Sequence, residues 1–169
     1  MFVKWLRENT IASYLLTIIR VYIGYQWLHA GWGKVTGGFD ASGFLKGSIG
    51  KASGDHPAVQ GWWASFLEGF ALPNSGLFSF MVAYGELLVG IGLILGGLTT
   101  FAALMGIVMN FAFMFSGTTS TNPQMTLLTI FILVAGYNAA KIGIDRWIIP
   151  FIRQFYAKDD KSAAYNEAS

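Results

Sequence analysis

The sequence predicts an all-α fold, an integral membrane bundle of four helices with a further, interfacial helix in the first connection. Of the 169 residues, 54% are hydrophobic and only 12% are charged, whereas soluble domains average about 25% charged residues. The hydrophobic residues gather in four stretches that reach or approach the roughly 20 residues a helix needs to cross a bilayer. The chain length suits one domain, which we place at residues 1–158.

The composition excludes several chemistries. The net charge of +2 is too small, and the basic residues are too dispersed, to indicate a nucleic-acid partner. Because the chain has no cysteine, it has no disulfide, no thiol nucleophile and no ligands for an iron–sulfur cluster. The two histidines, His29 and His56, lie far apart. We therefore expect no zinc site, and neither a metal nor a haem is clearly indicated.

The first two predicted helices cover residues 11–33 and 77–98. The first follows a charged segment, as in a signal peptide, but it is long and no small-residue cleavage pattern follows Gly33. We therefore interpret it as a helix that is retained. The second begins after the Pro-Asn-Ser run at 73–75, which marks a helix start.

The third and fourth predicted helices cover residues 99–117 and 125–144. Gly96 and Gly97 separate the third helix from the second, and so short a connection requires an antiparallel hairpin. The fourth helix is preceded by Asn122-Pro123, an N-cap residue followed by proline at the first helical position.

Two segments outside the four helices are expected at the membrane surface. In the first, residues 57–70, aromatic side chains and a leucine recur at spacings close to a helical turn, which predicts a helix on the outer leaflet. The polar stretch 46–55 before it is expected to be looser, in the position of a lid over the bundle. The second segment, 146–156, interleaves aromatic and basic residues. Residues 159–169 are expected to form a solvated cytoplasmic tail.

Basic residues near the helix ends predict the orientation, because Lys and Arg are retained on the cytoplasmic side. Seven lie on the side of the termini and three lie in the connection 34–76. The seven are Lys4, Arg7, Lys141, Arg146, Arg153, Lys158 and Lys161, and the three are Lys34, Lys46 and Lys51. We therefore expect a multi-pass protein of the cell membrane with both termini in the cytoplasm.

Arg20 and Glu86 are charged residues within the hydrophobic stretches. Each lies nine residues into its predicted helix, from opposite sides of the bilayer, so both are expected near the midplane. An unpaired charge at that depth costs at least about 2.5 to 3.5 kcal/mol, which predicts a mutual ion pair or a shared ligand. One interpretation is a purely structural pair that locks two helices together. The other is a pair that also contacts a substrate or cofactor.

Several further residues share faces with this pair. Gly24 and Trp27 lie along the helical stripe of Arg20, and Gly90 lies along that of Glu86. Small residues there either permit close helix packing or leave room for a ligand.

Four further polar residues lie in or near the predicted helices, and each has one or two interpretations. His29 is on the face opposite Arg20, where it either donates to a quinone carbonyl or ligates haem, or hydrogen-bonds to the loop. Asn110 carries a buried amide of the kind that often joins helices. Lys141 and Asp145 are four residues apart, which predicts a local ion pair.

These residues carry a resemblance to a known family. The order of polar and small residues resembles the DoxX/DoxD family of four-helix membrane proteins over approximately residues 11–147. The residues are Arg20, Gly24, Gly31 and Lys34, then Glu86, Gly90, Leu93 and Gly96, then Asn110 and the Gly143-Ile144-Asp145 run. The aromatic segment around Trp62-Trp63 is most similar to the DoxD branch. DoxD is the membrane subunit of thiosulfate:quinone oxidoreductase, so the resemblance implies electron transfer from a sulfur compound such as thiosulfate to the quinone pool.

A quinone-linked function assigns expected roles to these residues. Arg20 would stabilise negative charge on the quinone, and Glu86 would relay protons. Trp27 would stack on the ring or donate to it. The other expected quinone-binding residues are Gly24, Gly90, His29 and Asn110. Because the sequence shows no obvious electron carrier, oxidation would occur directly between bound substrates, on an undetected cofactor or in a partner subunit. A second redox subunit is therefore one expected partner, beside membrane lipid and a second copy of the chain.

Two alternatives belong to other functional classes. A non-catalytic membrane scaffold that recruits a redox partner would need the same buried charges for folding. A small-anion transporter would use Arg20 as its anion site, and four helices without duplicated halves would then require a dimer.

Overall fold

The structure is a computed structural model that describes residues 1–152, and all regular structure within them is helical. The all-α prediction is therefore confirmed. The expected tail 159–169 and the last part of the segment 146–156 lie outside the described residues.

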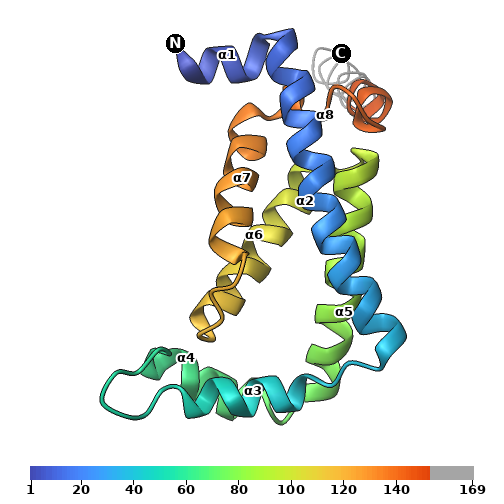
Figure 1. Cartoon of the computed structure of the whole chain (residues 1–169). Helices are drawn as coiled ribbons and strands as arrows, with labels where there is room; N and C mark the ends of the chain where they lie inside the picture. The colour runs from blue at the N-terminus through green and yellow to red at the C-terminus, as the bar shows by residue number, and fades with distance from the viewer. Residues whose placement is uncertain (153–169) are drawn as a thin grey trace, which may run out of the picture.

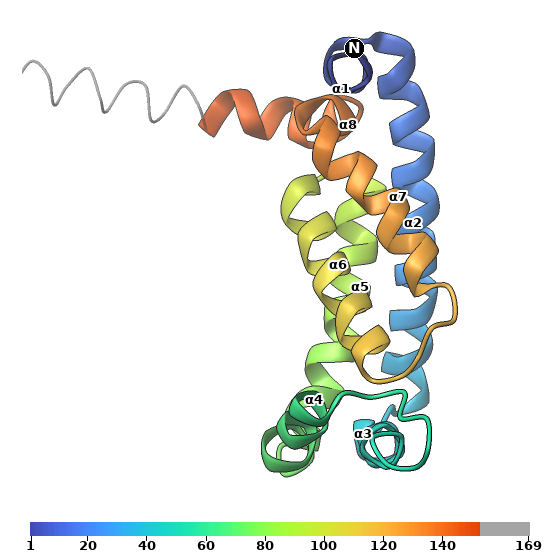
Figure 2. The same cartoon turned by 90° about the vertical axis from the view of Figure 1, so that its left-hand side faces the viewer.

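Four helices run side by side along the length of the molecule, and short helices lie crosswise at both ends (Figure 1, Figure 2). The long helices are α2 (Thr10–Gly37), α5 (Ser75–Leu95), α6 (Thr99–Phe115) and α7 (Asn122–Ala135). At one end lie α1 (Phe2–Glu8) and α8 (Tyr137–Ala140), and at the other lie α3 (Ala41–Gly50), α4 (Gly61–Phe66) and the π-helical turn η1 (Leu67–Ala71). The chain therefore forms a helical bundle with a separate layer across each end.

Local capping fixes the ends of α2 and the start of α3. The side chain of Asn9 accepts hydrogen bonds from the backbone nitrogens of Ile11 and Ala12, which satisfies free donors at the start of α2. Gly38 ends the helix in the left-handed conformation at φ 68°. Asp40 then caps α3 by accepting from the backbone nitrogen of Ser42.

The first connection contains more helix than the sequence predicted. The stretch 46–55 was expected to be loose, but half of it belongs to α3, which buries a face against η1. The predicted surface helix 57–70 is divided into α4 and η1. A small apolar cluster explains this order, since it gives the connection a core of its own; its buried members are Ala41, Leu45, Leu67 and Ala71.

The predicted fourth helix, 125–144, is interrupted. It ends at Ala135 because Gly136 adopts φ 57° and ψ −127°, a backbone conformation that residues with a side chain rarely reach. After the short α8 the chain turns back onto the hairpin between α5 and α6. There the backbone nitrogen of Ile144 donates to Leu95 at 3.1 Å and that of Asp145 donates to Gly96 at 2.8 Å.

Close approach between α2 and α5 sets the register of the bundle. A methyl group on Gly31 would lie 2.4 Å from the backbone nitrogen of Leu87, and one on Gly90 would lie 2.4 Å from that of Leu28. Gly24 packs against Ile94 in the same way. These glycines therefore serve helix packing, with Gly31 beside the middle of α5 and Gly24 nearer its end.

Within residues 1–152, α5 is the helix that is both long enough and apolar enough to cross a membrane by length and composition. The helices α6 and α7 are apolar but shorter.

Candidate functional site

The expected ion pair between Arg20 and Glu86 is wrong. Glu86 instead pairs with Lys34, whose Nζ lies 2.6 Å from the Glu86 Oε2 atom. Equal counts from the predicted helix starts implied equal depths, but α2 has 28 residues and its register places Gly31 beside Glu86 and Leu87. Arg20, three turns earlier on α2, therefore lies beside the end of α5 and is separated from Glu86 along the bundle.

Arg20 joins three segments at the α8 end of the bundle. It is 2% exposed, and its guanidinium donates to the backbone oxygen of Ile142 at 2.5 Å and approaches the hydroxyl of Thr99 at 3.5 Å. The group fills space beside Gly96 and Gly143, where a methyl on either residue would overlap it. These contacts, which we call the clasp, hold α2, the start of α6 and the segment after α8 together.

Asp145 completes the clasp. It was expected to pair with Lys141, but its two carboxylate oxygens accept from the backbone nitrogens of Leu98 and Thr99 at 2.7 and 2.8 Å. These nitrogens are free donors at the start of α6, so Asp145 caps that helix from a distant part of the sequence. Its negative charge also faces the Arg20 guanidinium.

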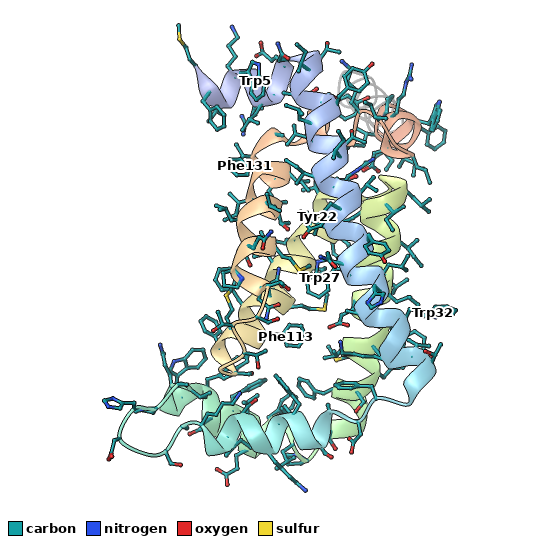
Figure 3. All side chains as sticks on the ribbon, viewed as in Figure 1. Trp5, Tyr22, Trp27, Trp32, Phe113 and Phe131 are labelled. Atoms are coloured by element: carbon teal, nitrogen blue, oxygen red, sulfur yellow. The ribbon has the colours of Figure 1, made fainter. Side chains whose placement is uncertain are left out.

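A cavity of about 480 Å³ lies at the other end of the bundle, between the long helices and the layer formed by α3, α4 and η1. Most of its wall is apolar, and seven Phe and Trp side chains line it: Trp27, Phe39, Phe44, Trp63, Phe66, Phe78 and Phe113. In Figure 3, Trp27 and Phe113 project into the interior of the bundle, whereas Trp32 on the same helix as Trp27 points outward. The cavity has the size and apolar character typical of small-molecule sites.

The Lys34–Glu86 pair supplies the charge in this cavity. Both residues line it, as do the expected site residues Trp27 and His29. The Glu86 side chain is 2% exposed and that of Lys34 is 25% exposed, so the lysine reaches toward the open side of the pair. The pair therefore places one cationic donor and one carboxylate in an otherwise aromatic wall.

The layer of α3, α4 and η1 forms a cap over the cavity. Two long-range hydrogen bonds connect this cap to the bundle. Trp63 on α4 donates from its indole nitrogen to the Ser116 hydroxyl at 2.9 Å. Lys51, after α3, donates to the backbone oxygen of Gly117 at 3.0 Å. Both acceptors lie in the turn after α6. The cap is therefore anchored to the bundle on the side opposite α2.

The expected site residues thus fall into four groups. Trp27, His29 and Glu86 meet at the cavity. Gly24 and Gly90 pack helices, and Arg20 belongs to the clasp at the far end. Asn110 is completely buried in α6.

Sequence reasoning missed Lys34 as the partner of Glu86, and it missed the aromatic cap as a wall of the site. A usable signal was present, because Lys34 is the basic residue in the last turn of α2 and faces an acidic residue within an apolar helix. The wall contributed by α3 and η1 depends on how the connection folds back, which spacing alone does not give.

The DoxX family model matches residues 15–119, which include most of α2, all of α5 and α6, and the connection that covers the cavity. Neither a curated protein nor a solved structure matches the chain.

Proposed function

The chain belongs to the DoxX family, and we propose that it is a multi-pass membrane protein that binds a quinone in the cavity beside Lys34 and Glu86. The proposal includes a role as the membrane subunit of a quinone-linked oxidoreductase that resembles the DoxD branch. The observation that carries it is an aromatic cavity with a single ion pair in its wall.

The distribution of polar and apolar side chains supports membrane insertion. Charged and amide side chains are buried inside the bundle, among them Arg20, Glu86, Asn110, Asn138 and Asp145. Large apolar side chains on the outer faces are more than half exposed, among them Ile11, Ile18, Phe80, Leu88, Phe101 and Leu127. Exposed apolar surface this extensive is unusual for a soluble monomer and suits contact with lipid.

Helix length agrees with this placement. At 1.5 Å per residue, the 28 residues of α2 extend about 42 Å, more than the roughly 30 Å of a hydrocarbon core. The termini side, with Lys4 and Arg7, is assigned to the cytoplasm by the positive-inside rule. The cavity and its cap then face the outer leaflet.

The cavity suits a quinone in both size and chemistry. A quinone ring is flat and apolar with two carbonyl oxygens, and aromatic walls provide stacking surface for such a ring. Lys34 is a donor for a carbonyl oxygen, and its charge favours any negative charge that develops there. Glu86 lies 2.6 Å from the same amine and is placed to hold or pass a proton at its carboxylate.

A bound quinone supplies reversible chemistry of two electrons and two protons. In this proposal Lys34 orients one quinone carbonyl oxygen and Glu86 holds or transfers a proton near that oxygen. The aromatic cap excludes water from the quinone ring. The cysteine-free chain offers no thiolate ligands for an iron–sulfur carrier. In this proposal the electrons come from a sulfur compound such as thiosulfate through a second redox subunit.

Binding is tested by titrating decylubiquinone into the full chain in nanodiscs and following tryptophan fluorescence. Lys34→Met removes a charge-assisted hydrogen bond, which predicts affinity roughly 10- to 100-fold weaker than wild type. Lys46→Met is the matched control, since Lys46 is exposed on α3 and is not part of the cavity wall. Absence of saturable binding to the wild-type chain would refute the quinone site.

Electron transfer is tested separately with membranes that contain the cellular partners. Thiosulfate-dependent quinone reduction should depend on the chain and fall strongly in Glu86→Gln, which keeps shape while it removes the ionisable group. A chain that binds quinone but supports no reduction, with or without partners, would exclude the oxidoreductase role and leave a scaffold.

A further inference from the structure

Asn110 is a buried amide with no hydrogen-bond partner. It is 0% exposed, and neither its Oδ1 nor its Nδ2 atom is bonded to any group in the described part of the chain. An unpaired buried polar group is costly, so such groups in native proteins call for an explanation. Asn110 is not simply joining helices by hydrogen bonds.

Trp27 presents a second free donor close to the same place. Its side chain is almost completely buried, its Nε1 atom has no partner among the described residues, and the residue lines the cavity. That nitrogen would lie 3.1 Å from a methyl group on Gly106. Asn110 is one helical turn beyond Gly106 on the same face of α6, in the direction of the cavity.

These two groups lie deeper in the bundle than the ion pair. Gly31 packs against the backbone of Glu86 and Leu87. Trp27 is four residues from Gly31 on α2, which places it about 6 Å further along the bundle. Ala112 on α6 and Ser116 just after it line the cavity, and Asn110 precedes them toward the interior, behind the residues that form the cavity wall.

We propose that Trp27 and Asn110 form an inner subsite that holds the second polar end of the ligand, opposite Lys34 and Glu86. This inference rests on the proposed function and makes it more specific. A ligand held at both ends has a flat apolar body with two hydrogen-bond acceptors at opposite positions, as in a para-quinone. Trp27 can only donate through its indole nitrogen, and the Asn110 amide also has a donor, so both suit a carbonyl oxygen.

Asn138 provides a matched comparison, because it is also a buried asparagine. Its Nδ2 atom donates to the backbone oxygens of Leu6 and Asn9 at 2.8 and 2.9 Å, so it holds α1 and α2 to α8. Removing that amide breaks bonds that the fold uses. Removing the Asn110 amide breaks none within the described chain.

The test compares stability and decylubiquinone affinity in the full chain in nanodiscs. Asn110→Leu and Trp27→Phe should each weaken binding by about threefold to tenfold, the effect of one hydrogen bond. Asn110→Leu should keep or raise the melting temperature, whereas Asn138→Leu should lower it. Asn110→Ala is the second variant if the larger side chain disturbs packing.

Two isomeric ligands test the ligand geometry. 1,4-Naphthoquinone and 1,2-naphthoquinone have the same size, but only the first has its carbonyls at opposite positions. The wild-type chain should favour the 1,4 isomer, and Asn110→Leu should lose most of that preference. The absence of cysteine removes thiol adducts from this comparison.

The outcomes separate the two proposals. No binding by the wild-type chain would reject the quinone site itself. Wild-type binding that depends on Lys34 but is unchanged in Asn110→Leu and Trp27→Phe would reject the inner subsite alone. A loss of stability in Asn110→Leu as large as that in Asn138→Leu, with unchanged affinity, would assign Asn110 to folding and reject the subsite as well.

Discussion

At the scale of single residues, the main finding is that two buried charges have separate partners. Glu86 is paired with Lys34 next to a cavity, and Arg20 is enclosed by backbone groups and Asp145 at the far end. That both charges would be buried was predictable, because each lies in an apolar stretch. Their partners were not, since partner choice depends on helix register and not on position along one helix.

We predict that Lys34 and Glu86 are energetically coupled. Lys34→Met leaves a carboxylate buried without its partner, which should destabilise the chain by about 3 to 5 kcal/mol. Glu86→Gln should cost less, because Lys34 is partly exposed and can reach water. The double variant Lys34→Met/Glu86→Gln, which combines the same two changes, should lose less than the sum of the two single losses, measured by thermal unfolding in detergent.

The matched cycle uses Arg20→Met with Glu86→Gln. These two residues are separated in the bundle, so their effects should add to within about 0.5 kcal/mol. Additive losses for Lys34 with Glu86, or strong coupling of Arg20 with Glu86, would contradict the assigned partners.

At the scale of helices, the register of α2 against α5 determines what meets in the cavity. The contact depends on glycines whose added methyl groups would overlap backbone atoms of the other helix. Glycines at these positions could be recognised in the sequence as packing or ligand residues, but the sequence did not decide between the two. The structure assigns Gly24 and Gly90 to packing.

We predict that Gly31→Ala destabilises the bundle by about 1 to 3 kcal/mol, because its methyl group would force the backbones of α2 and α5 apart. The same change should weaken quinone binding, since it moves Glu86. Gly33→Ala is the control on the same helix, with nothing within 4 Å of the new methyl. It should be neutral or slightly stabilising by calorimetry; equal losses for both variants would refute the close contact.

We predict that the stability of the first turn of α3 depends on pH. The Ser42 hydroxyl, and then its backbone nitrogen, hold the pKa of Asp40 below its usual value. A carboxylate with a lowered pKa in the folded state stabilises above its unfolded pKa, and that stability is lost as pH falls through the folded pKa. Acidification below about pH 4 should therefore loosen the first turn of α3.

Hydrogen exchange of the α3 amides, corrected for intrinsic rates, measures this loosening. Asp40→Asn keeps a capping side chain but cannot titrate, so its protection should be independent of pH over the same range. Protection that falls equally in both proteins would show that Asp40 is not responsible.

At the scale of the whole molecule, the bundle is closed at one end by a clasp and covered at the other by an aromatic cap. The all-helical class followed from composition, and the four long helices were predictable from apolar runs. The break at Gly136 and the fold of the cap were not, because one depends on a backbone conformation and the other on packing between distant segments.

We predict that the two ends lie on opposite sides of a membrane. Lys4→Cys and Ser53→Cys place single thiols at exposed positions near opposite ends of a chain that has no cysteine. On intact cells, an impermeant maleimide should label Ser53→Cys alone, and both should react after lysis. Labelling of Lys4→Cys alone on intact cells would reverse the orientation, and equal labelling of both would contradict a spanning bundle.

The quinone site can be located by the position at which a photoreactive azidoquinone cross-links to the full chain in nanodiscs, read by peptide mass spectrometry. We expect adducts in α3, α4 and the second half of α6, around Phe44, Phe66 and Phe113. Excess decylubiquinone should suppress them, and Lys34→Met should reduce them. Adducts confined to the segments around Arg20, or adducts that excess decylubiquinone does not displace, would contradict a quinone site in the cavity.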